Sequence, residues 1–311
     1  MRPVLLVTGA TGFIGRALLR QIEQSGLRQS CRVLLVASRP IPGWEVLEDK
    51  RRDGLYSFSE RDFADLEVEA VQSIIHLGAF TPKSGASAND VDGAFANIAN
   101  TRHLVGNAPG SGSARFVFLS SIDVYGRSID PVTEEHICRP ETLYGRSKLF
   151  CEQLLEALSA QAEIGELQVL RIGHTYGAGE ESYRKFIPET VRRILNGEGA
   201  HFFTTGEERR SFIHVDDCAR MILAGLTSPG DIGPITVASR HRATLREVAD
   251  QLAEAAAEAT GRKPVHTEQP EIARGDDVVF EVAKMERWLG LEHVPLGDGL
   301  REEFLHMSKL R

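Results

Sequence analysis

Short runs of consecutive apolar residues recur along the first two thirds of the chain, each followed by a helical pattern. The runs read VLLVTG at 4–9, RVLLVAS at 32–38, SIIHLGA at 73–79, RFVFLSS at 115–121 and LQVLRIG at 167–173. A strand with one face in water alternates apolar and polar residues, so uninterrupted apolarity indicates strands that are covered on both faces. Strands of this kind separated by helices predict an α/β fold with a doubly wound parallel sheet.

The rhythm changes after Gly177. The later stretch RSFIHVDDCARMILAGL at 210–226 reads as a strand, an N-cap formed by Asp216 and Asp217, and a helix. Thr244 is placed to open a further amphipathic helix. We expect two parts that share an interface, where α/β proteins bind ligands. The larger domain comprises residues 1–177 plus about 202–238, and the smaller C-terminal lobe comprises residues 178–201 plus 239–311.

Composition is that of an ordinary globular protein, with 42% hydrophobic and 26% charged residues. The formal net charge of −8 argues against a nucleic-acid surface, which needs concentrated lysine and arginine. The four cysteines are far apart and lack CxxC spacing, so they indicate neither a metal site nor a disulfide framework. A signal peptide or a membrane span of about 18 apolar residues is not indicated. These features predict a cytoplasmic protein without nucleic-acid or membrane partners.

The first strand runs into TGATGFIG, which places Gly9, Gly12 and Gly15 directly before a helical pattern. Glycines here permit a tight turn, close approach of the backbone to a pyrophosphate and close helix packing, while the helix N-terminus presents free N–H groups. Three glycines could also serve only as a tight turn. The order of strand, glycine loop and helix favours a dinucleotide site in a Rossmann-type sheet, although the spacing is G-x-x-G-x-x-G rather than G-x-G-x-x-G.

Tyr144 and Lys148 lie four residues apart in YGRSK, at the start of a long helical pattern. Residues at i and i+4 share one helix face, so the phenol and the ammonium can point into the same space. The cation would favour phenolate and lower the pKa of Tyr144 toward the range of a general base. Alone, such a pair is usually an exposed lysine beside a half-buried tyrosine. Ser120 and Ser121 strengthen the interpretation of Tyr144 and Lys148 as a catalytic pair, because they end a buried strand at the edge where parallel sheets bind ligands.

These motifs, in this order, resemble those of the extended short-chain dehydrogenase/reductase family of nucleotide-sugar epimerases, dehydratases and reductases. The likeness spans nearly the whole chain through TGATGFIG, RDFAD, IIHLGA, ANIANT, SSIDVYG, YGRSK, RIGHTYGAGE, RRSFIHVDDCA and RGDDVVFEVAKMERWLGLE. It implies that Tyr144 acts as base or acid, that Lys148 holds the nicotinamide ribose and tunes Tyr144, and that Ser121 binds the reacting oxygen. The expected cofactor-binding residues are Gly9, Thr11, Gly12, Phe13, Ile14, Gly15, Ser38, Arg39, Asp62 (beside the adenine), Phe63, Leu77, Gly78, Ala79, Asn97, Tyr144 and Lys148.

Two departures from the family narrow the reaction. In its 4,6-dehydratases, adjacent Asp and Glu residues after the catalytic hydroxyl handle elimination of water, and here the matching pair is Ile122 and Asp123. Isoleucine cannot donate a proton, so dehydration is disfavoured and hydride transfer is favoured. Asp123 is then either an accessory acid or base or a carboxylate that hydrogen-bonds nearby backbone. His174 stands where the family has a substrate-binding asparagine, and is either an accessory catalytic residue or part of the wall.

The resemblance also suggests that Lys185, Arg210 and Arg274 line the crevice and bind the substrate. Cations suit a diphosphate, and arginine can bind it in bidentate fashion. Exposed, solvated charge is the alternative. Family members are often dimers through a helix bundle that includes the Tyr-x-x-x-Lys helix, so the resemblance implies a homodimer.

The residues after the second strand bear on the choice of cofactor. In dinucleotide folds an acidic side chain here binds the ribose 2′-hydroxyl, whereas an arginine accommodates a 2′-phosphate. Ser38 and Arg39 end this strand, and the next carboxylate is Glu45. We expect NADP(H) rather than NAD(H), and hence an NADPH-dependent reductase of a nucleotide-linked 4-keto-sugar. The alternatives are a C4 epimerase that retains NAD, and a non-catalytic dinucleotide sensor on the same fold.

Overall fold

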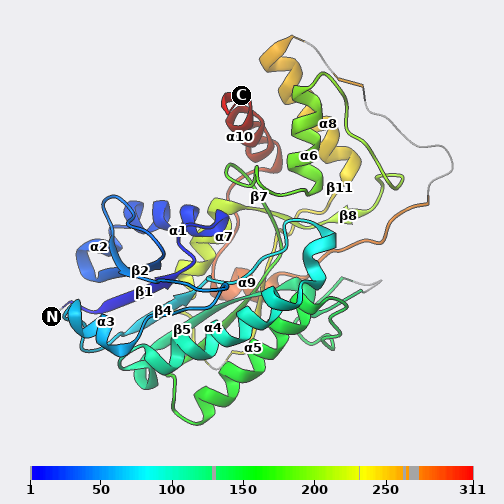
Figure 1. Ribbon diagram of the computed structural model, residues 1–311. Coiled ribbons are helices and arrows are strands. Elements are labelled where there is room, and N and C mark those ends of the chain that lie inside the picture. The colour runs from blue at the N-terminus through cyan, green and yellow to red at the C-terminus, as the bar shows by residue number, and fades with distance from the viewer. Residues whose placement is uncertain (1, 128–130, 231, 262–263, 266–272, 311) are drawn as a thin grey trace.

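The sheet that the apolar runs predict is present and parallel. The computed structural model describes residues 2–127, 131–230, 232–261, 264–265 and 273–310. In these ranges one seven-stranded sheet has the order β10-β6-β5-β4-β1-β2-β3, with each neighbouring pair parallel (Figure 1). Its strands are β1 (Val4–Thr8), β2 (Arg32–Ala37), β3 (Glu45–Glu48), β4 (Ser73–His76), β5 (Arg115–Ser121), β6 (Leu167–Ile172) and β10 (Ile235–Val237). The order reverses at β1, which makes the sheet doubly wound as predicted.

Helices cover both faces of the sheet. On β1, Leu5 and Val7 belong to one hydrophobic cluster, whereas Val4 and Leu6 belong to a second. This split of alternating side chains explains why the strands read as continuous apolar runs. The first face is covered by α1 (Phe13–Gln24) and α7 (Val215–Ala224), and the second by α4 (Val91–Asn107) and α5 (Leu143–Ala160) (Figure 1). The shorter helices beside this sheet are α2 (Leu27–Ser30), α3 (Glu60–Asp65) and α9 (Ala283–Trp288).

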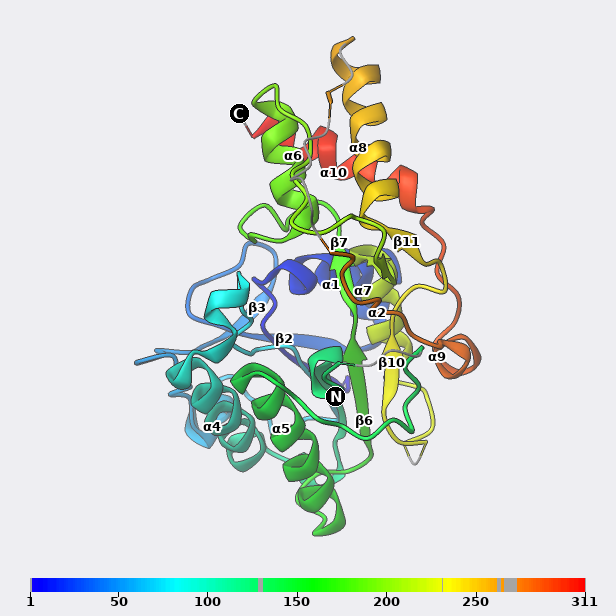
Figure 2. The ribbon, with the colours of Figure 1, turned by 90° about the vertical axis from the view of Figure 1, so that its right-hand side faces the viewer.

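Three further helices pack together beyond the sheet (Figures 1 and 2). They share a separate hydrophobic cluster that includes Val191, Leu252 and Phe304. The helices are α6 (Phe186–Leu195), α8 (Leu245–Thr260) and α10 (Leu296–Lys309). Two short strand pairs connect them to the sheet. One pair is β7 (His174–Tyr176) with β9 (Phe212–His214), and the other is β8 (Arg209–Arg210) with β11 (Ala243–Thr244). Not all of the C-terminal segment lies here, because Met285 and Leu289 in and after α9 belong to the core of the sheet.

One predicted helix cap is present and another is replaced. Thr244 opens α8 in a capping box, and its hydroxyl accepts the N–H of Glu247 at 3.0 Å. Asp216 and Asp217 do not cap α7, because both already lie in its first turn; the N-cap is His214, whose Nδ1 accepts the N–H of Asp216 at 3.3 Å. None of the helices in the described ranges is long and apolar enough to span a membrane. The four cysteines are unpaired.

Candidate active site

The glycine loop has the geometry of a phosphate cradle. Gly9 has φ of 73°, and a Cβ at Gly15 would lie 2.2 Å from the carbonyl oxygen of Gly9, so a side chain at either position would distort the turn. The first intrahelical bond of α1 runs from the N–H of Arg16 to the carbonyl oxygen of Gly12, and no side chain caps the helix. The preceding N–H groups, including those of Phe13 and Ile14, are therefore available to an anion. These residues fit a dinucleotide pyrophosphate.

At the end of β2, Ser38 and Arg39 are exposed. The segment after β3 runs beside them, because the N–H of Asp49 donates to the carbonyl oxygen of Ala37 at 2.9 Å. Asp49 is 0% exposed, and its carboxylate is occupied by Arg51 and by a backbone N–H. Asp49 therefore does not supply the acidic group that the end of β2 lacks.

Two residues expected at the adenine end have structural roles. Asp62 accepts the N–H and the hydroxyl of Ser59, each at 2.7 Å, in the capping box of α3, and these bonds lower the pKa of its carboxyl group. Phe63 is 0% exposed in the core of the sheet. Phe63 is held by core packing, whereas only Oδ2 of Asp62 takes part in the bonds to Ser59, so the contact of Asp62 with the adenine stays a prediction.

The segment after β4 lies against the glycine loop. A Cβ at Gly9 would lie 2.7 Å from the N atom of Gly78, so Leu77, Gly78 and Ala79 meet the phosphate cradle. Asn97 lies behind this segment, where its Oδ1 accepts the N–H of Phe80 at 2.7 Å and its Nδ2 donates to the hydroxyl of Ser147 at 3.1 Å. Asn97 thus connects the loop after β4 to α5, and its contact with the cofactor stays a prediction.

Ser121, Tyr144 and Lys148 converge where β5 meets the start of α5. The hydroxyl of Tyr144 lies near the hydroxyls of Ser121 and Thr81, both of which act to lower its pKa. The ammonium of Lys148 donates to the carbonyl oxygen of Leu119 at 2.6 Å and lies 4.9 Å from the ring centroid of Phe118. The sheet and the helix thus bring Ser121 together with Tyr144 and Lys148, which follow it by 23 and 27 positions.

The electrostatics of this trio differ from the expectation for Tyr144. Burial, with the carboxylate of Asp123 as the second cause, raises the pKa of Tyr144 above its usual range, so the expected lowering by Lys148 is wrong for the protein without its cofactor. Burial also lowers the pKa of Lys148 to about 8, against the opposing effects of Cys151 and Glu152. Tyr144 is consequently a phenol at neutral pH, and can donate a proton.

Asp123 and His174 flank the trio. The N–H of Asp123 donates to the hydroxyl of Ser121 at 3.2 Å. Asp123 is an exposed residue, but the protein around its carboxylate desolvates it in part and so raises its pKa, against the opposing effects of Ser121 and Lys185. Burial, with Arg210 and Lys185 as further causes, lowers the pKa of His174 to about 3, so its imidazole is neutral. The Nδ1 atom of His174 is buried without a hydrogen-bond partner among the described residues.

The three cations expected to bind substrate lie along one wall. Lys185 lies near Asp123 and stacks 4.7 Å from the ring centroid of Tyr183. Arg210 is half-buried and donates to the carbonyl oxygen of Asp276 at 2.6 Å. Arg274 is exposed and pairs with Asp277 at 2.6 Å. Lys185 and Arg210 both act on the pKa of His174, and Arg274 acts on the pKa of Arg210, so three cations lie near the neutral imidazole of His174 or near one another.

Several site residues escaped the sequence analysis. Thr81 contacts the Tyr144 hydroxyl and Tyr183 lies close enough to raise the pKa of Tyr144. Thr81 follows β4 by five residues, and its place after a buried strand was a usable signal. Glu152 and Arg171 form a buried ion pair beneath Lys148, with Nη2 and Oε2 2.8 Å apart. Glu152 and Arg171 lie on different elements, 19 residues apart, so no short sequence motif could have predicted that they pair.

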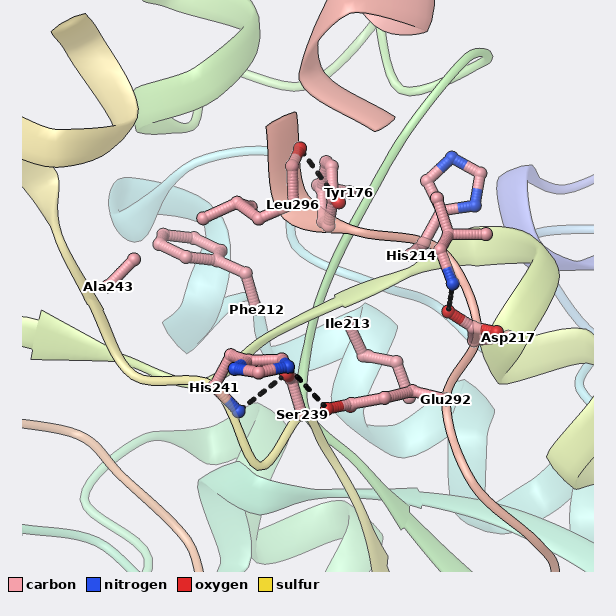
Figure 3. A pocket seen from close by; sticks show the side chains of 11 residues that line it. Tyr176, Phe212, Ile213, His214, Asp217, Ser239, His241, Ala243, Glu292 and Leu296 are labelled. Atoms are coloured by element: carbon pink, nitrogen blue, oxygen red, sulfur yellow. Dashed lines mark hydrogen bonds and ion pairs between the residues drawn. The ribbon is translucent and has the colours of Figure 1, made fainter. Parts of the chain in front are cut away.

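A separate small cavity lies away from these groups, between β9, α7 and the segment before α10 (Figure 3). Its volume of about 10 Å³ suits one water molecule rather than a nucleotide. Asp217 borders it and accepts the N–H groups of His293 at 2.9 Å and Val294 at 3.1 Å. The contacts around this cavity hold the segment before α10 against α7. Ser121, Tyr144 and Lys148 do not line it.

A Rossmann-type sheet with a glycine cradle, and with Ser121, Tyr144 and Lys148 near its carboxyl edge, is suited to binding a dinucleotide. The chain belongs to the NAD dependent epimerase/dehydratase family, whose model matches residues 5–237. This match confirms the family resemblance expected from the sequence. The relatives of the chain are enzymes that act on nucleotide sugars.

Relatives of this chain carry out different reactions. It is 29% identical to a dTDP-glucose 4,6-dehydratase of Streptomyces griseus over 95% of this chain and 91% of the relative. It is 24% identical to a dTDP-4-dehydro-6-deoxyglucose reductase of Escherichia coli over 80% of each. A solved UDP-glucuronic acid 4-epimerase of Bacillus cereus, in complex with UDP-glucuronic acid and NAD, has a TM-score of 0.79 at 20% identity, covering 99% of this chain and 100% of that one. The fold is therefore shared across three reactions.

Proposed function

We propose that this protein is an NADP(H)-dependent reductase that acts on the keto group of a nucleotide-linked 4-keto-sugar. The observation that carries the proposal is a buried Tyr144 with a raised pKa, beside the hydroxyl of Ser121 at the carboxyl edge of the sheet. A phenol with a raised pKa suits donation of a proton to an oxygen that gains charge, which is what reduction of a carbonyl requires.

The chain's residues account for the proton in this reaction. When bound, the reduced cofactor supplies a hydride to the carbonyl carbon. Ser121 orients the carbonyl oxygen by hydrogen bonding, and Tyr144 transfers its phenolic proton to that oxygen as the C–H bond forms. Solvent then returns a proton to the phenolate of Tyr144. The ammonium of Lys148 stabilises the phenolate in the interval, because an opposite charge favours the ionised form.

Arg39 supports the choice of NADP(H). It is exposed at the end of β2, where a dinucleotide fold places the adenosine ribose, and Ser38 beside it is compatible with a phosphate. The nearest carboxylate after β3, that of Asp49, is buried and occupied by Arg51. A 2′-phosphate would therefore meet a cation here, whereas a 2′-hydroxyl would find no free carboxylate from Asp49.

The wall opposite the cofactor supports a nucleotide-linked substrate. Lys185, Arg210 and Arg274 supply positive charge suited to a diphosphate. Dehydration remains disfavoured despite the likeness to a dehydratase, because Ile122 is an apolar, buried residue at the position of the acid. Asp123 is adjacent and open to the crevice, and can act on a hydroxyl of the sugar.

A C4 epimerase with retained NAD is the second candidate, since the solved 4-epimerase with this fold holds NAD. Mass spectrometry of molecules released from freshly purified, denatured protein separates the two. An empty site supports the reductase, and near-stoichiometric NAD refutes it in favour of the epimerase. A Tyr144→Phe protein that keeps full cellular function would support a non-catalytic sensor instead.

Cofactor selectivity is then measured with NADPH and NADH on the wild type and on Arg39→Ala. We expect Arg39→Ala to weaken NADPH binding by a factor of about 10 to 100, the value of one or two charge-assisted hydrogen bonds, and to leave NADH binding unchanged. Arg287→Ala, at an exposed arginine on α9, is the matched control. Equal losses for both cofactors would contradict the role of Arg39.

We also propose a homodimer in the cytoplasm. Val91 and Phe95 on α4 and Phe150 on α5 are 67%, 61% and 50% exposed, an unusual set of apolar side chains on neighbouring helices. The two helices lie side by side on the outer face of the sheet (Figure 1). A second copy of this face would cover them.

A further inference from the structure

A buried carboxylate lies one helical turn from Lys148. Glu152 follows Lys148 by four residues on α5, and the two residues are 2% and 3% exposed. Residues at i and i+4 are neighbours on a helix, so the ammonium can reach this carboxylate. It donates instead to the carbonyl oxygen of Leu119, near the carboxyl end of β5. Some other group must therefore satisfy Glu152.

Two side chains from the sheet do so. Arg171 on β6 donates its Nη2–H to Oε2 of Glu152 at 2.8 Å and its Nε–H to Oε1 at 3.2 Å. The hydroxyl of Ser120 also donates to Oε1. Ser120 and Arg171 are register partners on adjacent strands, so the sheet presents both donors to one helix position. The guanidinium stacks over the ring of Tyr125, with Cζ 4.8 Å from the centroid.

Because Glu152 and Arg171 are both buried, the loss of one charge would leave the other without a partner. Arg171 is 5% exposed, so without its guanidinium the carboxylate of Glu152 would be a buried charge without a cation. Such a charge either takes up a proton or acquires another cation. Lys148 is the cation on the same helix face. If it turned toward Glu152, the ammonium would leave the crevice and the space beside Tyr144.

We propose that Arg171 is a positioning residue for the reaction, because it occupies Glu152 and so keeps the ammonium of Lys148 at the crevice beside Tyr144. The inference rests on the function proposed above for Lys148. It extends that function to an ion pair that touches neither substrate nor cofactor. Ser120, next to Ser121 on β5, also helps to satisfy Glu152, because its hydroxyl donates to that carboxylate on α5.

The test follows the titration of Lys148 itself. The chain has seven lysines, so selective ¹³C-lysine labelling gives a simple NMR spectrum, and the signal missing from Lys148→Arg assigns Lys148. In Arg171→Met we expect the pKa of Lys148 to rise by about one pH unit or more, as it does when a carboxylate becomes the partner of a cation. In the double variant Glu152→Gln/Arg171→Met the rise should disappear. Lys284, bonded to the carbonyl oxygen of Pro234, is the internal control.

Binding provides the second measurement. Arg171→Met should weaken NADPH binding about tenfold, since it loses roughly one charge-assisted contact, and Glu152→Gln should restore it in the double variant. Arg115→Met, which breaks another ion pair of the same sheet, is the matched control and should leave both readouts unchanged. An unchanged Lys148 titration in Arg171→Met, or a double variant that binds NADPH no better than Arg171→Met, overturns the proposal.

If Arg171→Met does not fold, Glu152→Gln provides a further test. Glu152→Gln alone keeps Arg171 and should lower the pKa of Lys148, while NADPH binding stays as in the wild type. Unchanged titration of Lys148 in this variant would also overturn the proposal. The titration requires neither substrate nor cofactor, so a protein with the expected NMR result but no reductase activity refutes the proposed function and leaves the positioning role standing.

Discussion

Glu180 and Glu303 form a buried carboxyl pair between the segment after β7 and α10. They are 2% and 1% exposed, each influences the pKa of the other, and Glu303 accepts the N–H of Gly177 at 3.2 Å. Two buried carboxylates near each other repel, so the pair favours the uptake of a proton. Burial raises the pKa of Glu180 from 4.5 to about 7, despite the opposing charges of Lys185 and Arg192, and burial and Glu180 raise the pKa of Glu303.

The sign of the pH dependence follows from these shifts. The folded protein binds protons at this pair more tightly than the unfolded chain does, so the free energy of unfolding falls as pH rises. Between pH 4.5 and about 7 the loss from Glu180 is about 3 kcal/mol, since each pH unit is worth about 1.4 kcal/mol. The low exposure of both groups leaves little solvent screening. Ionisation of Glu303 adds a loss of the same sign.

Glu303→Gln tests this reasoning. Its amide oxygen can accept the N–H of Gly177, and its NH₂ group can donate to an ionised Glu180, so the need for a proton disappears. Urea unfolding followed by circular dichroism at pH 5 and pH 8 should show the variant about 3 kcal/mol more stable than the wild type at pH 8 and little changed at pH 5. Glu302→Gln, at an adjacent residue whose side chain is 55% exposed, is the control. A Glu303→Gln difference that is equal at both pH values would refute the reasoning.

Three further outcomes are expected. Tyr144→Phe should slow hydride transfer by a factor of about 100 to 10,000 without weakening NADPH binding, as measured by stopped-flow fluorescence, and a rate within tenfold of the wild type would exclude Tyr144 as the acid. Gly15→Ala places a Cβ 2.2 Å from the carbonyl oxygen of Gly9, so melting temperature and NADPH affinity should both fall in a thermal-shift assay; an unchanged pair of values would mean that the cradle does not need the glycine. Phe95→Glu should convert the dimer to a monomer in light scattering, whereas Phe203→Glu, at a phenylalanine that is 79% exposed but lies outside α4 and α5, should not. A monomeric wild type would contradict the proposed dimer directly.

The comparison with the sequence is clearest at the strands. The run at 4–7 is apolar throughout because Leu5 and Val7 face one layer of helices while Val4 and Leu6 face the other. Such a pattern needs no knowledge of distant contacts, so it predicted the doubly wound sheet correctly. Caps were less certain, because Asp216, Asp217 and His214 are all suitable beside α7, and only the backbone conformation selects His214.

The chemistry of single side chains depended on the tertiary structure. The spacing of Tyr144 and Lys148 indicated a shared helix face, but the direction of the Tyr144 pKa shift was set by burial and by Asp123. Asp62 had the residue type for an adenine contact, and the structure adds a second role, because its Oδ2 accepts two bonds from Ser59 in the capping box of α3.

By itself, the sequence determined the fold, the glycine cradle and the membership of an enzyme family, because periodicity and short motifs express local backbone requirements. Only the tertiary structure decided which polar groups meet across the sheet. Arg171 and Glu152 are 19 residues apart, and Glu180 and Glu303 are joined from separate parts of the chain. Burial and electrostatic interaction depend on distance in space, and such pairs have no fixed spacing in the sequence.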